Sequence, residues 1–180
     1  MISESTKPHV IRTVRIPSSL DTELRKVARE NKSSVNSIAE GALTKFVEFD
    51  QFSQDFDYVV VPKTLLVKAA QYLTQTQIKE FGEWAAKGPG SDTVQFYGKS
   101  KSLNAVLNTF EGIGARYSRL FAFHHETDGK DHTITLNHGM GMKWSLFYGA
   151  NLKKIFKELL DMKIETQLTE NVVVGHFSET

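Results

Sequence analysis

The chain has 180 residues, a hydrophobic content of 40%, a charged content of 24% and a formal net charge of +1, all ordinary values for a soluble globular protein of one or two domains. It contains no cysteine, which excludes disulfides, thiolate metal ligands and a cysteine nucleophile, and which suits the reducing cytoplasm. Because the net charge is close to zero, any contact with DNA must come from local placement of basic side chains.

The first predicted element is a short strand over residues 11–17, IRTVRIP. Successive side chains of a strand point to opposite faces. Pro17 cannot donate to a strand ladder and therefore ends the strand. One face carries Val14 and Ile16, and the other carries Ile11, Thr13 and Arg15.

Two helices are predicted next. Ser18 to Asp21, SSLD, matches a capping box in which aspartate replaces the usual glutamate, so the first helix begins here and runs to about Glu30. Ser34 is the predicted N-cap of the second helix. Both helices have an apolar stripe at helical spacing. The stripes consist of Leu20, Leu24, Val27 and Ala28, and of Val35, Ile38, Ala39, Ala42, Leu43, Phe46 and Val47.

A unit of one strand and two helices is too small to bury much apolar surface alone, and a lone edge strand is prone to pair with another chain. Both difficulties are removed if two copies pair their strands into an antiparallel ribbon over a shared four-helix core. Val14 and Ile16 then face the core, whereas Thr13 and Arg15 face solvent. A two-stranded ribbon fits the major groove of B-DNA, where strand side chains can contact base edges.

This stretch resembles the ribbon-helix-helix family of DNA-binding repressors, the Arc and MetJ type, over about residues 10–49. The resemblance rests on RTVRIPSSLDTELRKVAREN and SSVNSIAEGALTKFVEF. It implies that Ile11, Thr13 and Arg15 contact bases and that Ser34, Val35 and Asn36 clamp a DNA phosphate, as the positive end of a helix dipole favours. Arg12 lies on the core-facing parity, so either it swings to a phosphate or the strand begins only at Thr13.

The rest of the chain predicts an α+β fold. Residues 51–61 form a connector, and KGPGSD at 87–92 is expected to break the chain. Helices are predicted over 63–73, 75–87, 101–112 and 143–160, and strands on both sides of Asp128-Gly129 and over TENVVVGHF at 169–177. We therefore expect a DNA-binding and dimerisation domain over 1–50, the connector, and an α+β domain over 62–180 with helices packed on a small antiparallel sheet.

The histidines are the one cluster in the C-terminal part with metal-binding potential. If Asp128 and Gly129 are the central residues of a two-residue turn, Thr127 pairs with Lys130, His125 lies opposite His132, and Phe123 lies opposite Ile134. Opposed Cβ atoms are about 4.5–5.5 Å apart, close enough for two imidazoles to share a metal or sense pH. His138 lies six residues beyond His132, roughly 20 Å along the strand, too far to join them. Two histidines alone make a poor site, so we expect no metal and no cofactor.

No phosphate-binding loop, nucleophile elbow or HExxH motif occurs, so no enzymatic activity is expected. Trp144, Phe147 and Tyr148 either line a small-molecule pocket or pack in the core. The layout also resembles uncharacterised archaeal ribbon-helix-helix proteins with a helix that starts KWS, here Lys143, Trp144 and Ser145, a resemblance that implies no activity. No segment has the apolar core of a signal peptide or the about 18 apolar residues of a membrane helix.

These patterns predict a cytoplasmic, dimeric or higher even-numbered transcriptional regulator that binds double-stranded operator DNA. The C-terminal domain then senses a small-molecule effector, sets the assembly, or does both. Two alternatives remain: an antitoxin-like DNA-binding protein that sequesters a protein partner, and a ligand-binding domain that the ribbon unit merely dimerises.

Overall fold

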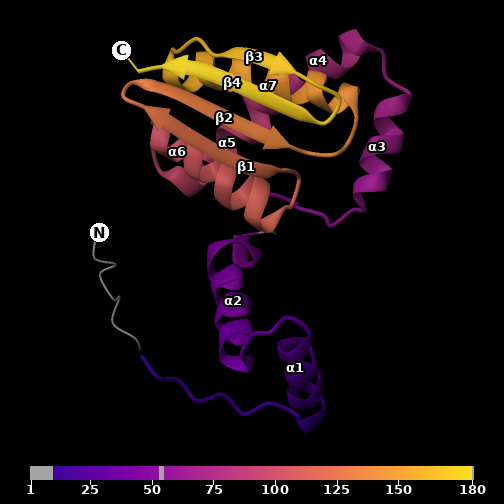
Figure 1. The fold of residues 1–180 in the computed structure, drawn as a ribbon, viewed down its shortest axis with the longest axis vertical. Coiled ribbons are helices and arrows are strands. Elements are labelled where there is room, and N and C mark those ends of the chain that lie inside the picture. The colour runs from indigo at the N-terminus through magenta and orange to yellow at the C-terminus, as the bar shows by residue number, and fades with distance from the viewer. Residues whose placement is uncertain (1–9, 53–54, 180) are drawn as a thin grey trace. The chain divides into compact units, whose positions relative to one another are not determined.

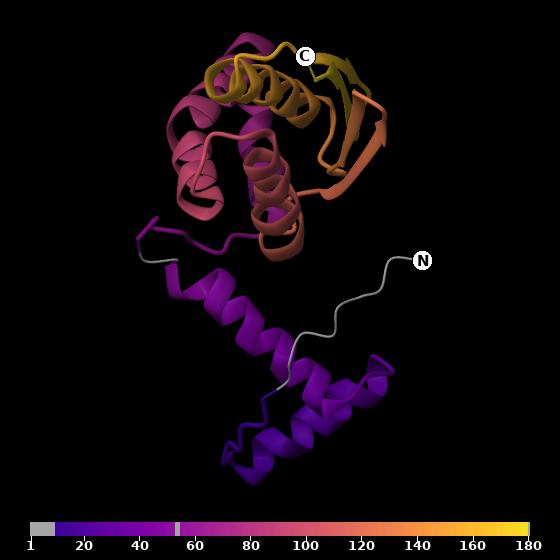
Figure 2. The same cartoon turned by 90° about the vertical axis from the view of Figure 1, so that its left-hand side faces the viewer.

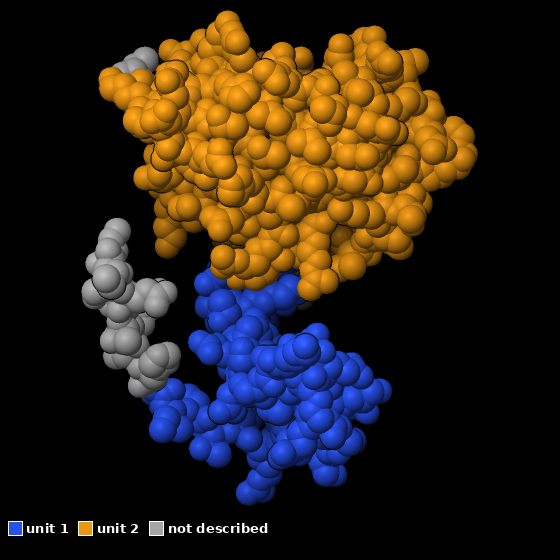
Figure 3. All heavy atoms as spheres, viewed as in Figure 1, with its two compact units in different colours: residues 1–52 blue, residues 53–180 orange. Residues whose placement is uncertain are grey.

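The computed structural model describes residues 10–52 and 55–179 of the protein, and the chain divides into two compact units, residues 1–52 and 53–180 (Figure 3). Residues 1–9 of the predicted N-terminal domain and residues 53–54 of the predicted connector lie outside the described residues.

The first unit consists of two helices, α1 (Ser18–Glu30) and α2 (Val35–Glu48), followed by the short 3₁₀ helix η1 (Asp50–Phe52) (Figure 1). The predicted N-cap of α2 is confirmed, because the Ser34 side chain accepts a hydrogen bond from the Ser37 backbone N–H at 3.0 Å. The predicted capping box of α1 is wrong. Pro17 is the N-cap and makes no side-chain cap, because the proline side chain has no hydrogen-bond acceptor. Asp21 instead pairs with Arg25 one turn later, at 2.7 Å.

Residues 10–16, the N-terminal segment, precede α1 without regular secondary structure, and all their side chains are exposed. No backbone hydrogen bond joins them to another part of the described chain. The predicted strand needs a second copy of the chain as its partner, so the intermolecular ribbon stays a prediction.

The second unit is built on a four-stranded antiparallel sheet in the order β1-β2-β4-β3. Helices cover one face of this sheet and leave the other open (Figures 1 and 2). The predicted α+β class is therefore confirmed. The strands are β1 (Ala122–Asp128), β2 (Asp131–Asn137), β3 (Glu165–Leu168) and β4 (Val172–Ser178). The helices are α3 (Lys63–Gln71), α4 (Gln75–Ala85), α5 (Ser91–Gly98), α6 (Leu103–Thr109) and α7 (Met142–Leu160), with π-helical stretches η2 (Ala86–Gly90) and η3 (Phe110–Tyr117).

The core lies between the covered face of the sheet and the longest helix, α7. Alternate residues of β2 and β4 are buried, as expected when one face of a strand packs and the other is solvated. Leu136, Val173 and Leu152 of α7 are fully buried there. Trp144, Phe147 and Tyr148 are also buried core residues, so their apolar side chains pack in the interior.

The predicted hairpin exists, but the predicted pairing is wrong by two residues. Asp128 pairs with Asp131, so Gly129 and Lys130 are the central turn residues. Gly129 has a φ of +63°, and glycine at the first central position is typical of a tight hairpin turn. The pairs of this register include Thr127 with His132, His125 with Ile134 and Phe123 with Leu136.

The predicted break at KGPGSD is also wrong. The backbone stays helical from α4 through η2 into α5, with Pro89 inside the π-helical stretch. Proline removes one backbone donor, and a π-helical turn is a common place for a helix to absorb such an irregularity. The helix predicted over 101–112 begins at Leu103 and continues as η3 to Tyr117. Among the described helices, none is both long and apolar enough to cross a bilayer.

Candidate functional site

The first unit leaves most of its apolar side chains uncovered. Ala28 is the only buried residue between positions 10 and 52. Several large side chains of the predicted apolar stripes are exposed, among them Leu43 at 62% and Phe46 at 55%. Leu24 and Ile38 are half-buried between the two helices. Two short helices alone therefore form no core, although their sequences carry the apolar positions for one.

The predicted base-contacting residues lie in the N-terminal segment. Ile11 is 91% exposed, and Thr13 and Arg15 are exposed as well. Within residues 10–52, neither Arg12 nor Arg15 forms an ion pair, whereas Arg25 pairs with Asp21. Both side chains are exposed.

The predicted phosphate-contacting residues form the start of α2. Ser34 is the N-cap, and Val35 and Asn36 are the first two helical residues. The first backbone N–H groups of a helix have no partner within it. Since the Ser34 hydroxyl occupies the N–H of Ser37, the N–H groups of Val35 and Asn36 remain for an outside acceptor. No hydrogen bond in the described chain joins the N-terminal segment to this helix start.

The two weak metal candidates do meet, on the covered face of the sheet. Nε2 of His125 lies 2.9 Å from Nδ1 of His132, and the rings stack with an interplanar angle of 8°. They are diagonal neighbours rather than opposed residues, and diagonal pairs are within reach of large side chains. His132 also stacks on Phe177, and its Nε2 lies 2.9 Å from a Glu179 carboxylate oxygen.

The surroundings of this pair favour the neutral form of His125. Burial, and then the neighbouring His132 and His124, lower the pKa of His125. Among the described residues, no group of three histidine, aspartate or glutamate side chains is arranged to hold a metal ion. The arrangement can share a proton between the two imidazoles, and it lacks the ligand set of a zinc site.

A second histidine network, which the sequence analysis missed, lies between β2 and α7. His138 and Ser145 are both buried, and Nε2 of His138 lies 2.8 Å from the Ser145 hydroxyl. The backbone N–H of Met140 donates to Nδ1 of His138 at 3.0 Å. Nδ1 is therefore the acceptor, so the neutral ring carries its proton on Nε2 and donates to Ser145.

This proton arrangement excludes a serine nucleophile activated by histidine. The Ser145 hydroxyl donates in turn to the carbonyl oxygen of Thr169 at 2.5 Å, so His138 acts as donor where a general base must be acceptor. Burial, followed by the charge of Lys63, lowers the pKa of His138 to about 4. The network joins β2, α7 and the loop before β4, and its role is structural.

Compared with protein-family models, with curated proteins and with solved structures, the chain finds no match in any of the three.

Proposed function

We propose that the protein is a dimeric, sequence-specific DNA-binding transcriptional regulator whose N-terminal segments pair between two subunits and enter the major groove as a β-ribbon. The observation that carries this proposal is the missing core of the first unit, in which only Ala28 is buried between positions 10 and 52. A second copy would supply the two things that this unit lacks. These are a partner strand for residues 10–16 and an apolar cover for α1 and α2.

The energy of such a dimer can be judged from the exposed side chains. Burying a leucine, valine or phenylalanine side chain contributes about 1.5–3 kcal/mol. Between 46% and 62% of each of four side chains is exposed: Leu20, Leu43, Phe46 and Val47. In a two-fold interface each of these residues occurs in two copies, one from each subunit. Because each is already about half buried, covering the rest contributes about half of that value per side chain, which offsets part of the cost of association.

DNA binding follows from what remains outside this interface. In a ribbon with Val14 and Ile16 toward the helices, Ile11, Thr13 and Arg15 face away from them. Arginine is the side chain that most often recognises guanine in the major groove, whereas apolar and threonine side chains suit the thymine methyl group. Arg12 and the free N–H groups of Val35 and Asn36 would bind the phosphate backbone on either side.

Substitution of Arg15 by alanine tests this assignment. We expect a loss of about 1–3 kcal/mol in binding to a selected DNA sequence, because a bidentate arginine–guanine contact contributes that much to discrimination. Binding to random DNA should change much less. The measurement is a titration of wild type and R15A on both DNAs at one fixed salt concentration, with the DNA selected from a random pool.

Arg25→Ala is the matched control, since Arg25 already pairs with Asp21 within α1. This variant should bind both the selected and the random DNA with nearly the wild-type affinity. An equal loss by R15A on selected and random DNA would reduce Arg15 to a phosphate contact. A protein that shifts no DNA at low salt would overturn the proposal.

A further inference from the structure

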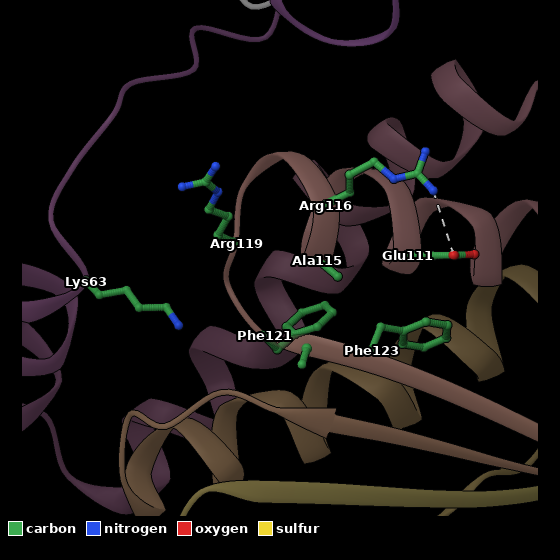
Figure 4. A pocket seen from close by; sticks show the side chains of 8 residues that line it. Lys63, Glu111, Ala115, Arg116, Arg119, Phe121 and Phe123 are labelled. Carbon is green, nitrogen blue, oxygen red and sulfur yellow. Dashed lines mark ion pairs between the residues drawn. The ribbon is translucent and has the colours of Figure 1, made fainter. Parts of the chain in front are cut away.

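An open pocket of about 500 Å³ lies on the second unit, beside η3, the start of β1 and the start of α3 (Figure 4). Its lining residues are Lys63, Glu111, Ala115, Arg116, Arg119, Phe121, Ala122 and Phe123. In Figure 4, Lys63 lies to the left of the two phenylalanine rings, Glu111 lies above Phe123, and both arginine side chains lie above the rings. The pocket thus combines basic side chains with an aromatic floor.

Positive charge is concentrated here although the unit as a whole is balanced. Residues 53–180 carry as many acidic as basic side chains, yet three basic residues and a single acidic one line this pocket. Glu111 lies 3.9 Å from Arg116, and both side chains are 61% exposed, so this ion pair is weak. Arg119 forms no ion pair within the described chain, and the Lys63 ammonium donates to the His138 carbonyl oxygen.

The aromatic floor is fixed by packing from below. Phe121 is buried, and its ring packs against Phe110 and edge-on against Tyr148. Gly114 of η3 lies directly against the same ring, because a Cβ atom there would come within 2.5 Å of it. The floor is therefore rigid before any ligand arrives, which lowers the entropic cost of binding.

Arg119 occupies a backbone position at which glycine is the usual residue. Its φ is +53°, in the left-handed region that costs other residues energy. The Leu120 N–H closes the end of η3 by donating to the Gly114 carbonyl oxygen at 3.0 Å. An arginine here is conformationally less favourable than glycine. π-Helical turns such as η3 are common at functional sites.

We propose that this pocket binds a small organic anion, with its carboxylate or phosphate group held by Arg119 and Lys63 and its planar apolar body on Phe121 and Phe123. Planar guanidinium groups bind both anions in a bidentate manner, and apolar pockets with a few placed polar groups are typical ligand sites. Binding itself requires no DNA; only a role of this anion as effector rests on the function proposed above.

The test uses the full chain without DNA and four probes: phenyl phosphate, benzoate, inorganic phosphate and benzyl alcohol. By calorimetric titration at low ionic strength, we expect phenyl phosphate or benzoate to bind at least ten-fold more tightly than inorganic phosphate and benzyl alcohol. The tighter of the two aromatic anions identifies the preferred anionic group. Binding of inorganic phosphate as tight as that of both aromatic anions would overturn the proposal.

Arg119→Gly separates a binding role from a structural one. Glycine relieves the left-handed strain, so R119G should raise the urea midpoint of unfolding while it weakens binding of the preferred aromatic anion at least ten-fold. Lys99→Gly is the matched control: Lys99 is also basic, has a φ of +52° and ends α5 outside the pocket. K99G should raise the midpoint and leave binding unchanged. Unchanged anion binding in R119G would contradict the assignment, whatever the DNA-binding activity of the chain.

Discussion

Replacement of Phe46 by aspartate is expected to convert the proposed dimer into monomers and to abolish the proposed DNA binding. Phe46 lies in the last turn of α2, on the apolar stripe between Leu43 and Val47, and is 55% exposed in the single chain. Because only the exposed half of each phenylalanine is newly buried, losing both copies from a two-fold interface removes about 2–3 kcal/mol, and a charge placed there adds a desolvation cost. The dimer dissociation constant should rise at least 100-fold, as measured by sedimentation velocity over a range of protein concentrations.

Thr44→Asp provides the matched control, because helical spacing places Thr44 on the opposite side of α2 from Phe46. T44D should stay dimeric and bind DNA. The second unit has its own core, so F46D should keep its near-ultraviolet spectrum and its unfolding transition. A wild-type protein that sediments as a monomer, or an F46D protein that remains a dimer, would show that this face is not the interface.

The second large effect concerns pH. The second unit should lose about 3 kcal/mol of unfolding free energy as pH falls from about 6.5 to about 4, because of His138 alone. Burial, and then the charge of Lys63, lower the pKa of His138 from 6.5 to about 4. Between these values the unfolded chain binds a proton that the folded chain does not. The stabilisation is therefore complete above pH 6.5 and is lost as pH approaches 4. Protonation of Nδ1 would also displace the Met140 N–H from its acceptor.

Urea unfolding at pH 7, 6, 5 and 4 measures how the free energy of unfolding changes with pH. Tryptophan fluorescence monitors the second unit, because both tryptophans, Trp84 and Trp144, belong to it. His138→Gln should be less stable at pH 7, because a buried hydrogen-bond network is disturbed, and should have a flatter pH profile. His176→Gln, on the exposed face of β4, should keep the wild-type profile. The same slope in wild type and H138Q would contradict the assignment of the pH dependence to His138.

The sequence patterns predicted those helices and strands whose apolar residues recur at regular spacing within a single segment of the chain. The helices α1, α2, α4 and α7 and the strands β1, β2 and β4 all follow from periodicity within one segment. The α2 N-cap was predicted because Ser34 needs only the next turn of its own helix. Such features depend on neighbours in the chain, which the sequence contains.

Features that depend on distant contacts were missed. The four-residue edge strand β3 exists through its pairing with β4, and ETQL has no apolar alternation strong enough to mark it. KGPGSD carries strong turn chemistry, yet α4, η2 and α5 remain helical through it as they pack in the unit. The hairpin register depends on which two residues occupy the turn. The predicted turn residues, Asp128 and Gly129, are displaced by one position from the observed ones, Gly129 and Lys130.

The candidate sites divide in the same way. The alternation of Ile11, Thr13 and Arg15 is a property of the sequence, whereas the pairing that we propose for them requires a second copy of the chain. His138 and Ser145 are seven residues apart, and only the folded β2–α7 connection brings their side chains together. The left-handed backbone of Arg119 has no signature in the sequence, because glycine is the residue that normally marks such a position.

The pairing of two N-terminal segments is the central claim, and single-cysteine cross-linking tests it most directly. The chain contains no cysteine, so one cysteine introduced at each of positions 10–16 in turn can form only intermolecular disulfides. In an antiparallel ribbon with two-fold symmetry, one residue near Thr13 lies opposite its own copy, within the distance a disulfide requires.

Under mild oxidation, the rate of disulfide formation should peak sharply at that position, fall at its neighbours, and disappear when F46D is added. Lys32→Cys, in the exposed turn between α1 and α2, should cross-link only slowly. Rates that are equal along positions 10–16 and no faster than that of K32C would mean that the two segments do not meet, and the regulator proposed here would lose its DNA-binding element.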